Sequence, residues 1–490
     1  MAGPTRSLDP RSPVLVGLGV ANDPAPVVDL MTAAVTAAAA DAGAAGLLRR
    51  IERIAVPQGT WSLTDPARTV ARRIGSPDAC TILCEIGVSQ QEVINDALVA
   101  VATGRAATAV VVGAEDRAWS RTGGVDTDEE GAPPDAVLTR PPEFVAPVEQ
   151  AAGMVVPPVQ QYALIENALG AAGRLPPARQ RAEIADLWAR YNAVAVDNPE
   201  AAFPEPRRAI DIATPGPRNR PLAYPYNRWH ASQWTVDQAA ALLICSAERA
   251  QEAGVAPDRW LFPLVALHCS EAVTLTARRH LEAWPAMGVL GRAAAQRLGR
   301  PLHELPFAEV YSCFPSAVRV QQRELGLDPA GTPTLTGGMA FAGGPFNHYV
   351  LQSLHVLGAQ LRADPGAQGL QTTVSGMLSK PGLAVWSATP PVEGGVPLGA
   401  DLAAEAVTAT EVVPVVREGP VAATPATVVS FTVTYGGASG FDPVRTAIVA
   451  DLPDGDRTAA TCEDAGTARL AVAEGLIGRA VSVKDTTFSL

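Results

Sequence analysis

The sequence is poor in cysteine and histidine, and neither residue forms a pattern typical of a disulfide framework or a metal site. The six cysteines have no paired spacing and mostly lie in apolar runs, so we expect reduced thiols. The six histidines show no metal-ligand spacing, so no metal site is expected. No apolar run has the length of a membrane span, and the first residues lack the plan of a secretory signal. We therefore expect a cytoplasmic protein outside the membrane.

Composition and charge favour a large protein of α/β layers. The 490 residues are enough for two to four domains, and the hydrophobic fraction of 47% contains much alanine and valine. The net charge of −12 argues against nucleic acid as a general partner. An acidic protein can still bind an anionic ligand through a local basic cluster.

Residues 84–116, CEIGVSQQEVINDALVAVATGRAATAVVVGAED, predict a buried helix between two strands. Ser89 and Glu92 have the spacing of a capping box, apolar residues then repeat at helical intervals, and Gly104 ends the helix. Apolar runs at 81–84 and 108–112 predict the flanking strands. The small residues on a broad apolar face are typical of a helix packed between two layers.

This segment, with GRAATAVVVGAE at 104–115, resembles the first half of the thiolase superfamily. In thiolases a nucleophilic cysteine stands at the start of this helix, where the helix dipole lowers the pKa of a thiol. Counted back from Gly104 without a gap, that position falls on Gly87, which has no side chain to attack a thioester. Further segments resemble the branch related to the sterol-carrier-protein thiolases: Trp61 within 57–75, 161–169, and DQAAAL at 237–242.

In that family, three loops of the second half carry the other active-site residues. The loop with an asparagine or histidine matches YSCF at 311–314, which places Tyr311 at that position. The loop with the basic histidine matches GGMAFAGGP at 337–345 and has Gly344 where the base belongs. The loop with the second cysteine matches TVSG at 373–376, with Ser375 nearest.

The resemblance covers roughly residues 13–390 and implies the thiolase fold, an α/β fold. Two similar five-stranded mixed-sheet halves form a layered αβαβα arrangement in that fold. The implied core is 1–118 and 232–390, with an N-terminal half of 1–231 and a C-terminal half of 232–390 that begins with a strand at 239–246. Residues 119–231 are expected to be an inserted loop domain, starting with a loop rich in proline, glycine and acidic residues at 119–150.

The last hundred residues predict a separate small domain. From residue 391 the sequence is rich in valine, threonine, glycine and proline, with alternating runs at 427–435 and 446–451, a strand signal at 475–483 and a turn at Asp454 and Gly455. We expect 391–490 to form a small β-barrel of the OB type, similar to domains that accompany some thiolase-like proteins as separate subunits. Few aromatic and several acidic residues argue against stacking on bases, so an interaction or capping role is expected.

Three residues are candidates for acid–base chemistry. Tyr311 can donate a hydrogen bond to a thioester oxygen or move a proton; the alternative is a core tyrosine. Asn347 is expected to cap the next helix, which places His348 and Tyr349 in its first turn near the pocket. Because a helix N-terminus disfavours a protonated imidazole, His348 can act as a neutral base; the alternative is an ordinary surface or core histidine.

The remaining candidates each have a structural alternative. Cys84 is either a displaced nucleophile or a small buried hydrophobe, and Cys313 is expected to be a packing residue. Backbone N–H groups of Gly376 or Gly87 can stabilise an oxyanion, or the glycines simply form tight turns. Arginines in the inserted region either hold the phosphates of coenzyme A or are solvated; the CoA-binding candidates are Arg218, Arg220 and Arg228.

Three functions are compatible with these residues. The first is a protein that is acetyl-CoA acetyltransferase-like by fold and acts in acyl-CoA lipid or sterol metabolism without conventional thiolase chemistry, through a tyrosine-based retro-aldol cleavage. The second is a non-catalytic acyl-CoA-binding or scaffold protein. A conventional thiolase would need Cys84 or Cys313 as the nucleophile, which the spacing does not support. The expected partner is acyl-CoA or CoA, with CoA as part of the substrate and no other cofactor, in a homodimer or a monomer.

Overall fold

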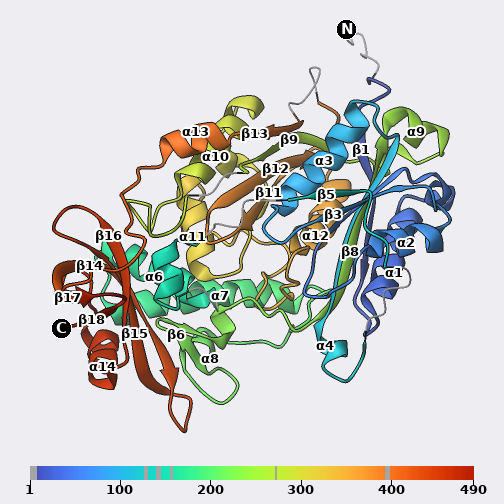
Figure 1. Cartoon of the computed structure of the whole chain (residues 1–490). Coiled ribbons are helices and arrows are strands. Elements are labelled where there is room, and N and C mark those ends of the chain that lie inside the picture. Colours follow the sequence, from blue (N-terminus) through green and yellow to red (C-terminus); the bar gives the residue numbers. More distant parts are fainter. Residues whose placement is uncertain (1–7, 126–130, 140–144, 155–157, 271–272, 392–397) are drawn as a thin grey trace.

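The computed structural model describes residues 8–125, 131–139, 145–154, 158–270, 273–391 and 398–490. Two mixed sheets form the core of the protein. A third sheet forms the C-terminal domain at the left of Figure 1. No helix among the described residues is long and apolar enough to cross a membrane. Within the same residues, no group of three or more histidine, cysteine or acidic side chains is arranged to hold a metal ion.

The first sheet has the strand order β1-β8-β4-β2-β3-β5. Its strands are β1 (Pro13–Ala21), β2 (Arg53–Pro57), β3 (Cys80–Cys84), β4 (Thr108–Asp116), β5 (Ala136–Leu138) and β8 (Asp237–Ser246). Strand β8 was expected to open the second half, and this prediction is wrong. It lies between β1 and β4 and pairs antiparallel with both, so the chain returns from the inserted region to complete the first sheet.

The second sheet has the order β10-β11-β12-β9-β13. Its strands are β9 (Phe262–His268), β10 (Phe307–Glu309), β11 (Gln368–Ser375), β12 (Lys380–Ser387) and β13 (Leu398–Asp401). Strand β13 pairs with β9, so the thiolase-like core continues past the expected boundary at residue 391. Helix α13 (Ala403–Ala409) then packs on α10 (Pro285–Leu298).

The two sheets share a four-strand unit. In the first sheet, β1-β8-β4-β2 run with antiparallel, antiparallel and parallel pairings. In the second, β9-β12-β11-β10 repeat the same three pairings in the same order. The expected internal repetition is therefore real. The halves differ at their edges, where β3 and β5 extend the first sheet and β13 extends the second.

Helices cover both faces of the sheets. Helices α3 (Gln90–Ala102) and α12 (Tyr349–Ala363) lie between the two sheets and contact strands of both. Helices α1 (Val27–Asp41) and α2 (Pro66–Ile74) cover the outer face of the first sheet, and α10 covers that of the second. This is the layered arrangement of the thiolase fold. Shorter elements are α9 (Ala247–Glu252), α11 (Pro315–Glu324) and 3₁₀ turns at Ala45–Arg50, Arg228–His230, Pro257–Arg259 and Leu302–Glu304.

The inserted region is mostly helical. It contains α4 (Arg117–Ser120), α5 (Pro147–Ala151), α6 (Val159–Ala172), α7 (Pro177–Val196), α8 (Ala209–Ala213), β6 (Pro221–Ala223) and β7 (Tyr226–Asn227). The expected loop at 119–150 is interrupted by β5, which pairs in parallel with β3 and so covers the edge of the first sheet. Residues 126–130 and 140–144 of that expected loop lie outside the described residues.

The C-terminal domain is a ring of strands. In the order β15-β16-β18-β17-β14, the last strand also pairs with the first and closes the ring. Its elements are β14 (Thr424–Gly436), β15 (Asp442–Asp451), β16 (Arg457–Cys462), α14 (Ala465–Glu474), β17 (Ala480–Lys484) and β18 (Thr487–Ser489). The strand signal at 475–483 is therefore correct only from Ala480. The ring packs on α6 of the inserted region. Strand β6 pairs with β14 of the ring, and β7 pairs with β6.

Candidate functional site

The start of helix α3 brings together three of the predicted site residues, Gly87, Ser375 and Tyr311. Gly87 lies in the loop between β3 and α3 with a φ of +102°, a conformation that side-chain-bearing residues rarely adopt. A cysteine at this position would strain the backbone. The backbone conformation of this loop therefore favours glycine at residue 87.

The carbonyl oxygen of Gly87 is held by two side chains from the β11–β12 hairpin. The Ser375 hydroxyl donates to it over 3.0 Å, and the ammonium group of Lys380 donates to it as well. These two residues face each other across the hairpin register. The side chain of Ser375, expected near an oxyanion, thus fixes the Gly87 loop.

Helix α3 begins where the capping-box pattern places its start, but without the expected side-chain bond. Ser89 is the N-cap residue, yet its hydroxyl makes no capping hydrogen bond and has no partner in the described part of the chain. The next residue, Gln90, hydrogen-bonds the Tyr311 side chain and accepts the N–H of Val350 over 2.8 Å. Gln90 therefore joins the α3 start to Tyr311 and to helix α12.

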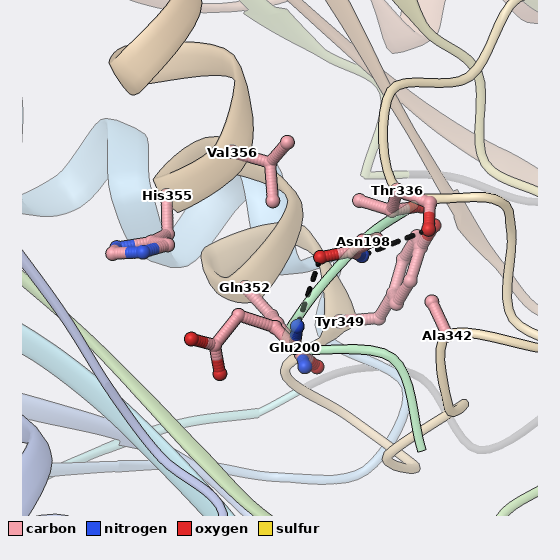
Figure 2. A pocket seen from close by; sticks show the side chains of 8 residues that line it. All are labelled: Asn198, Glu200, Thr336, Ala342, Tyr349, Gln352, His355 and Val356. Atoms are coloured by element: carbon pink, nitrogen blue, oxygen red, sulfur yellow. Dashed lines mark hydrogen bonds between the residues drawn. The ribbon is translucent and has the colours of Figure 1, made fainter. Parts of the chain in front are cut away.

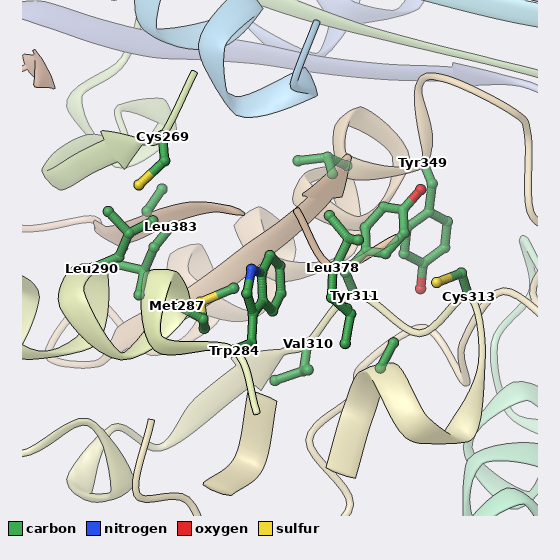
Figure 3. Close-up of a cluster of buried hydrophobic side chains, with 14 of the residues drawn as sticks. Cys269, Trp284, Met287, Leu290, Val310, Tyr311, Cys313, Tyr349, Leu378 and Leu383 are labelled. Carbon is green, nitrogen blue, oxygen red and sulfur yellow. The ribbon is translucent and has the colours of Figure 1, made fainter. Parts of the chain in front are cut away.

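Tyr311 lies in a cluster of buried hydrophobic side chains, as Figure 3 shows. Burial raises the pKa of its hydroxyl, so the phenol keeps its proton and serves as a donor. Its ring meets the Tyr349 ring edge-on, with 5.7 Å between centroids. The structure thus brings Tyr311 next to the start of α3.

Tyr349 is directed elsewhere. Its hydroxyl bonds Oε1 of the buried Glu309 over 2.8 Å and the Thr336 hydroxyl over 2.6 Å. Figure 2 shows Tyr349 beside Thr336 at a small polar pocket that Asn198 and Glu200 also line. Glu309 in turn accepts the N–H groups of Leu335 and Thr336, so this network holds the glycine-rich loop.

His348 is the N-cap residue of α12, and the prediction that Asn347 caps this helix is wrong. The Asn347 amide instead donates to the carbonyl of Gln58 over 3.0 Å. His348 is 1% exposed, and burial lowers the pKa of its imidazole to about 3, so the ring is neutral at pH 7. It packs against Gly113 of β4 and bonds the backbone of Gln238. Its role as a base remains a prediction.

The position expected for the basic histidine is filled. A Cβ atom built on Gly344 would lie 1.8 Å from the Ser232 hydroxyl oxygen, and the Gly344 N–H donates to the carbonyl of Gln233. Ser232 directly follows the inserted region. A side chain at residue 344 would require the Ser232 hydroxyl to move.

The two cysteine candidates are both buried. Cys84 lies at the end of β3 inside the hydrophobic layer. Cys313 hydrogen-bonds Tyr162, and burial raises the pKa of its thiol to about 12, which leaves it protonated. Tyr162 donates to the carbonyl of Gly376 over 2.9 Å and stacks on Phe314. Cys313 is thus a packing residue.

The arginines of the inserted region gather around Trp229. Arg207 lies 3.6 Å and Arg228 lies 5.4 Å above its ring, measured to the centroid. Burial and the positive charges of Arg218 and Arg228 lower the pKa of Arg207, so these three guanidinium groups are close together. Arg220 is exposed, and its backbone carbonyl accepts the N–H of Arg228.

Lys380, Gln90, Tyr162 and Ser232 were not found from the sequence. Gln90, Tyr162 and Ser232 carry no signal in a single sequence, because their roles depend on contacts across the fold. Lys380 carries one: of the 38 lysine and arginine residues, only Lys380 and Lys484 are lysines. A buried lysine in a chain that otherwise uses arginine is a specific feature.

No family model and no curated protein matches this sequence. Solved structures do match. A monomeric SCP2-thiolase-like protein type 1 from Mycobacterium smegmatis is 26% identical, with a TM-score of 0.83, over 99% of this chain and 100% of that chain. An Ltp2–ChsH2(DUF35) aldolase is 19% identical, with a TM-score of 0.58, over 77% and 98% of the two chains. An acetyl-CoA acetyltransferase from Syntrophomonas wolfei is 18% identical, with a TM-score of 0.55, over 77% and 99%.

Proposed function

Because this chain is a thiolase-superfamily protein of the SCP2-thiolase-like kind, we propose that it binds coenzyme A thioesters at the start of helix α3 without forming an acyl-cysteine. One observation carries the proposal: Tyr311, Ser375 and Lys380 surround the α3 start, while the nucleophile position is a glycine with a positive φ. The Tyr311 hydroxyl can donate to a thioester oxygen, Ser375 and Lys380 hold the loop through the Gly87 carbonyl, and residue 87 has no side chain to attack the thioester carbon.

The cluster of Arg207, Arg218 and Arg228 around Trp229 is the proposed anchor for the phosphates. Guanidinium groups bind phosphate through charge-assisted paired hydrogen bonds. In a chain with a net charge of −12, these three arginines concentrate positive charge around Arg207, which also pairs with Glu205 over 3.0 Å. Trp229 keeps Arg207 in place by stacking.

The anchor is within reach of the α3 start. The N–H of Ser232 donates to the carbonyl of Cys313 over 3.0 Å, next to Tyr311 in the same loop. Ser232 follows Arg228 by four positions, a length of chain that spans at most about 14 Å. A long ligand can therefore place its phosphates on the arginines and its thioester at Gly87.

Calorimetric titration with CoA and acetyl-CoA tests the binding. Replacing Arg207 and Arg228 by glutamine should weaken the binding of CoA at least about tenfold, because each charge-assisted contact contributes about 1.5–3 kcal/mol to the binding free energy. Arg208→Gln is the matched control, since this arginine is exposed and paired with Asp211. No binding to the unaltered protein, or an equal loss in the control, would contradict the proposal.

Retro-aldol cleavage is the second candidate, favoured by the bond between Tyr311 and Gln90 at the α3 start. A base removes the β-hydroxyl proton, the Cα–Cβ bond breaks to give a carbonyl product, and the electron pair passes to the thioester enolate that a Tyr311 hydrogen bond stabilises. The enolate then takes a proton to give the shorter acyl-CoA.

This second function is tested with 3-hydroxy-3-methylbutyryl-CoA. Tyr311→Phe should abolish release of acetyl-CoA while CoA binding stays unchanged, and Tyr349→Phe should retain the cleavage. If the unaltered protein binds CoA and releases no acetyl-CoA, the non-catalytic acyl-CoA-binding or scaffold function is the one that stands.

A further inference from the structure

Lys380 occupies the space beside the lost nucleophile. A Cβ atom built on Gly87 would lie 3.6 Å from the Lys380 nitrogen, within ordinary contact distance. The lysine is 2% exposed, at the first position of β12, and its ammonium group bonds the Gly87 carbonyl. Gly87 and Ser375 next to it are half-buried, so the amine lies just beneath the rim of the site.

The chain uses arginine almost everywhere that it needs a positive charge. Apart from Lys380, the one lysine is Lys484, which is exposed at the end of β17. Arginine keeps its proton in proteins, whereas lysine can lose a proton when it is buried and then act as a nucleophile. An arginine at residue 380 could also supply a positive charge or a hydrogen-bond donor. Only a lysine supplies an amine that can react.

We propose that Lys380 is a covalent acyl-acceptor site, which a bound acyl-CoA thioester acylates at the side-chain nitrogen. The inference rests on the proposed binding of CoA thioesters, which delivers the acyl carbon to the α3 start. The lysine ammonium first releases a proton to solvent; the neutral amine then attacks the thioester carbonyl, the C–N bond of an amide forms and the C–S bond breaks. The proton from the amine passes to the departing thiolate, so CoA leaves as the free thiol and no other reactant is needed.

The product sets the stoichiometry. An amide is far less reactive than a thioester, so the acyl group stays on Lys380 and each chain accepts one. The acylated side chain then fills the space at Gly87. Lys380 is therefore a modification site whose occupancy records exposure to acyl-CoA.

The experiment incubates the full-length protein with acetyl-CoA and follows intact mass, with peptide mapping of the adduct. One acetyl group is expected at Lys380, with Lys484 at least tenfold less acetylated. Lys380→Arg should lose the adduct and Lys484→Arg should keep it. A thermal unfolding scan tests whether Lys380→Arg is folded. If this variant does not fold, Lys380→Met replaces it.

CoA titration of the same samples separates the two ideas. If CoA binds and no adduct forms, or if Lys484 is acetylated as fast as Lys380, the acyl-acceptor inference is overturned and the binding function stands. If CoA does not bind, the proposed function fails and the inference fails with it. An adduct on a cysteine would also overturn the inference.

Discussion

The hydroxyl of Tyr349 lies 2.8 Å from Oε1 of Glu309, and this contact fixes a buried carboxylate beneath the glycine-rich loop. Burial raises the pKa of Glu309, although the N–H groups of Leu335 and Thr336 and the Tyr349 hydroxyl favour its ionised form. The tyrosine closest to the lost base therefore supports the loop structurally.

Removing this hydroxyl should destabilise the protein. Tyr349→Phe leaves Glu309 with one donor fewer in a buried site, at a cost of about 1–3 kcal/mol in the free energy of unfolding. Urea unfolding measures the change. Tyr435→Phe, at a half-buried position in the barrel, is the control and should cost less. Equal losses in the two variants would show that the Glu309 contact contributes nothing specific.

Glu115 should make stability depend on pH. Burial raises the pKa of this carboxyl to about 7, against hydrogen bonds from the Thr60 hydroxyl and N–H. The folded pKa lies above the unfolded value of 4.5, so the folded state binds the extra proton. The stabilisation is complete below pH 4.5 and is lost as the pH rises through about 7; the shift corresponds to about 3 kcal/mol.

Glu115→Gln tests this dependence, because the amide keeps the shape of the neutral carboxyl. Between pH 5 and 8 the unfolding free energy of the variant should fall less steeply than that of the unaltered protein. Glu418→Gln changes an exposed carboxylate and should leave the slope as it is. Parallel curves for all three proteins would contradict the assignment.

Arg457 joins the C-terminal ring to the core. It is 1% exposed, its Nε bonds Asp451 over 2.6 Å, and its guanidinium also donates to the carbonyl of Arg278. Arg457→Met should cost about 3 kcal/mol, as for one partner removed from a buried pair, and should increase hydrogen exchange in β15 and β16. Arg479→Met removes an exposed pair with Glu474 and should cost less than about 1 kcal/mol. Unchanged hydrogen exchange in β15 and β16 of the Arg457→Met variant would show that other contacts hold the ring on the core.

Asp135 holds β5 on the edge of β3. Its carboxylate accepts the N–H of Thr81 over 2.8 Å and pairs with Arg68 over 2.8 Å. Asp135→Ala should release β5 and expose unpaired N–H and C=O groups of β3, which favours pairing between chains. Light scattering after size exclusion should then show self-association that rises with concentration. Asp211→Ala, at an exposed pair, is the control; a variant as monodisperse as this control would mean that β5 does not protect the edge.

The sequence predicted local structure better than pairing across the fold. Helix α3 was predicted close to its observed bounds, because periodicity and Gly104 act within one segment; the start of β4 was predicted correctly, but the strand continues from the predicted end at 112 to Asp116. The sheet membership of β8 and β13 depends on backbone partners far away in sequence, which an apolar run cannot specify. Residue counting predicts Gly87 and Gly344 as the equivalents of the nucleophile and the base; the positive φ of Gly87 and the Ser232 hydroxyl beside Gly344 required the structure.

The position of the Ser232 hydroxyl bears on which residues position 344 can hold. Because this hydroxyl lies where a side chain on residue 344 would begin, a larger residue there requires the Ser232 side chain to turn away or to be replaced. The residue sizes tolerated at positions 232 and 344 are therefore coupled, although the two positions are far apart in the sequence.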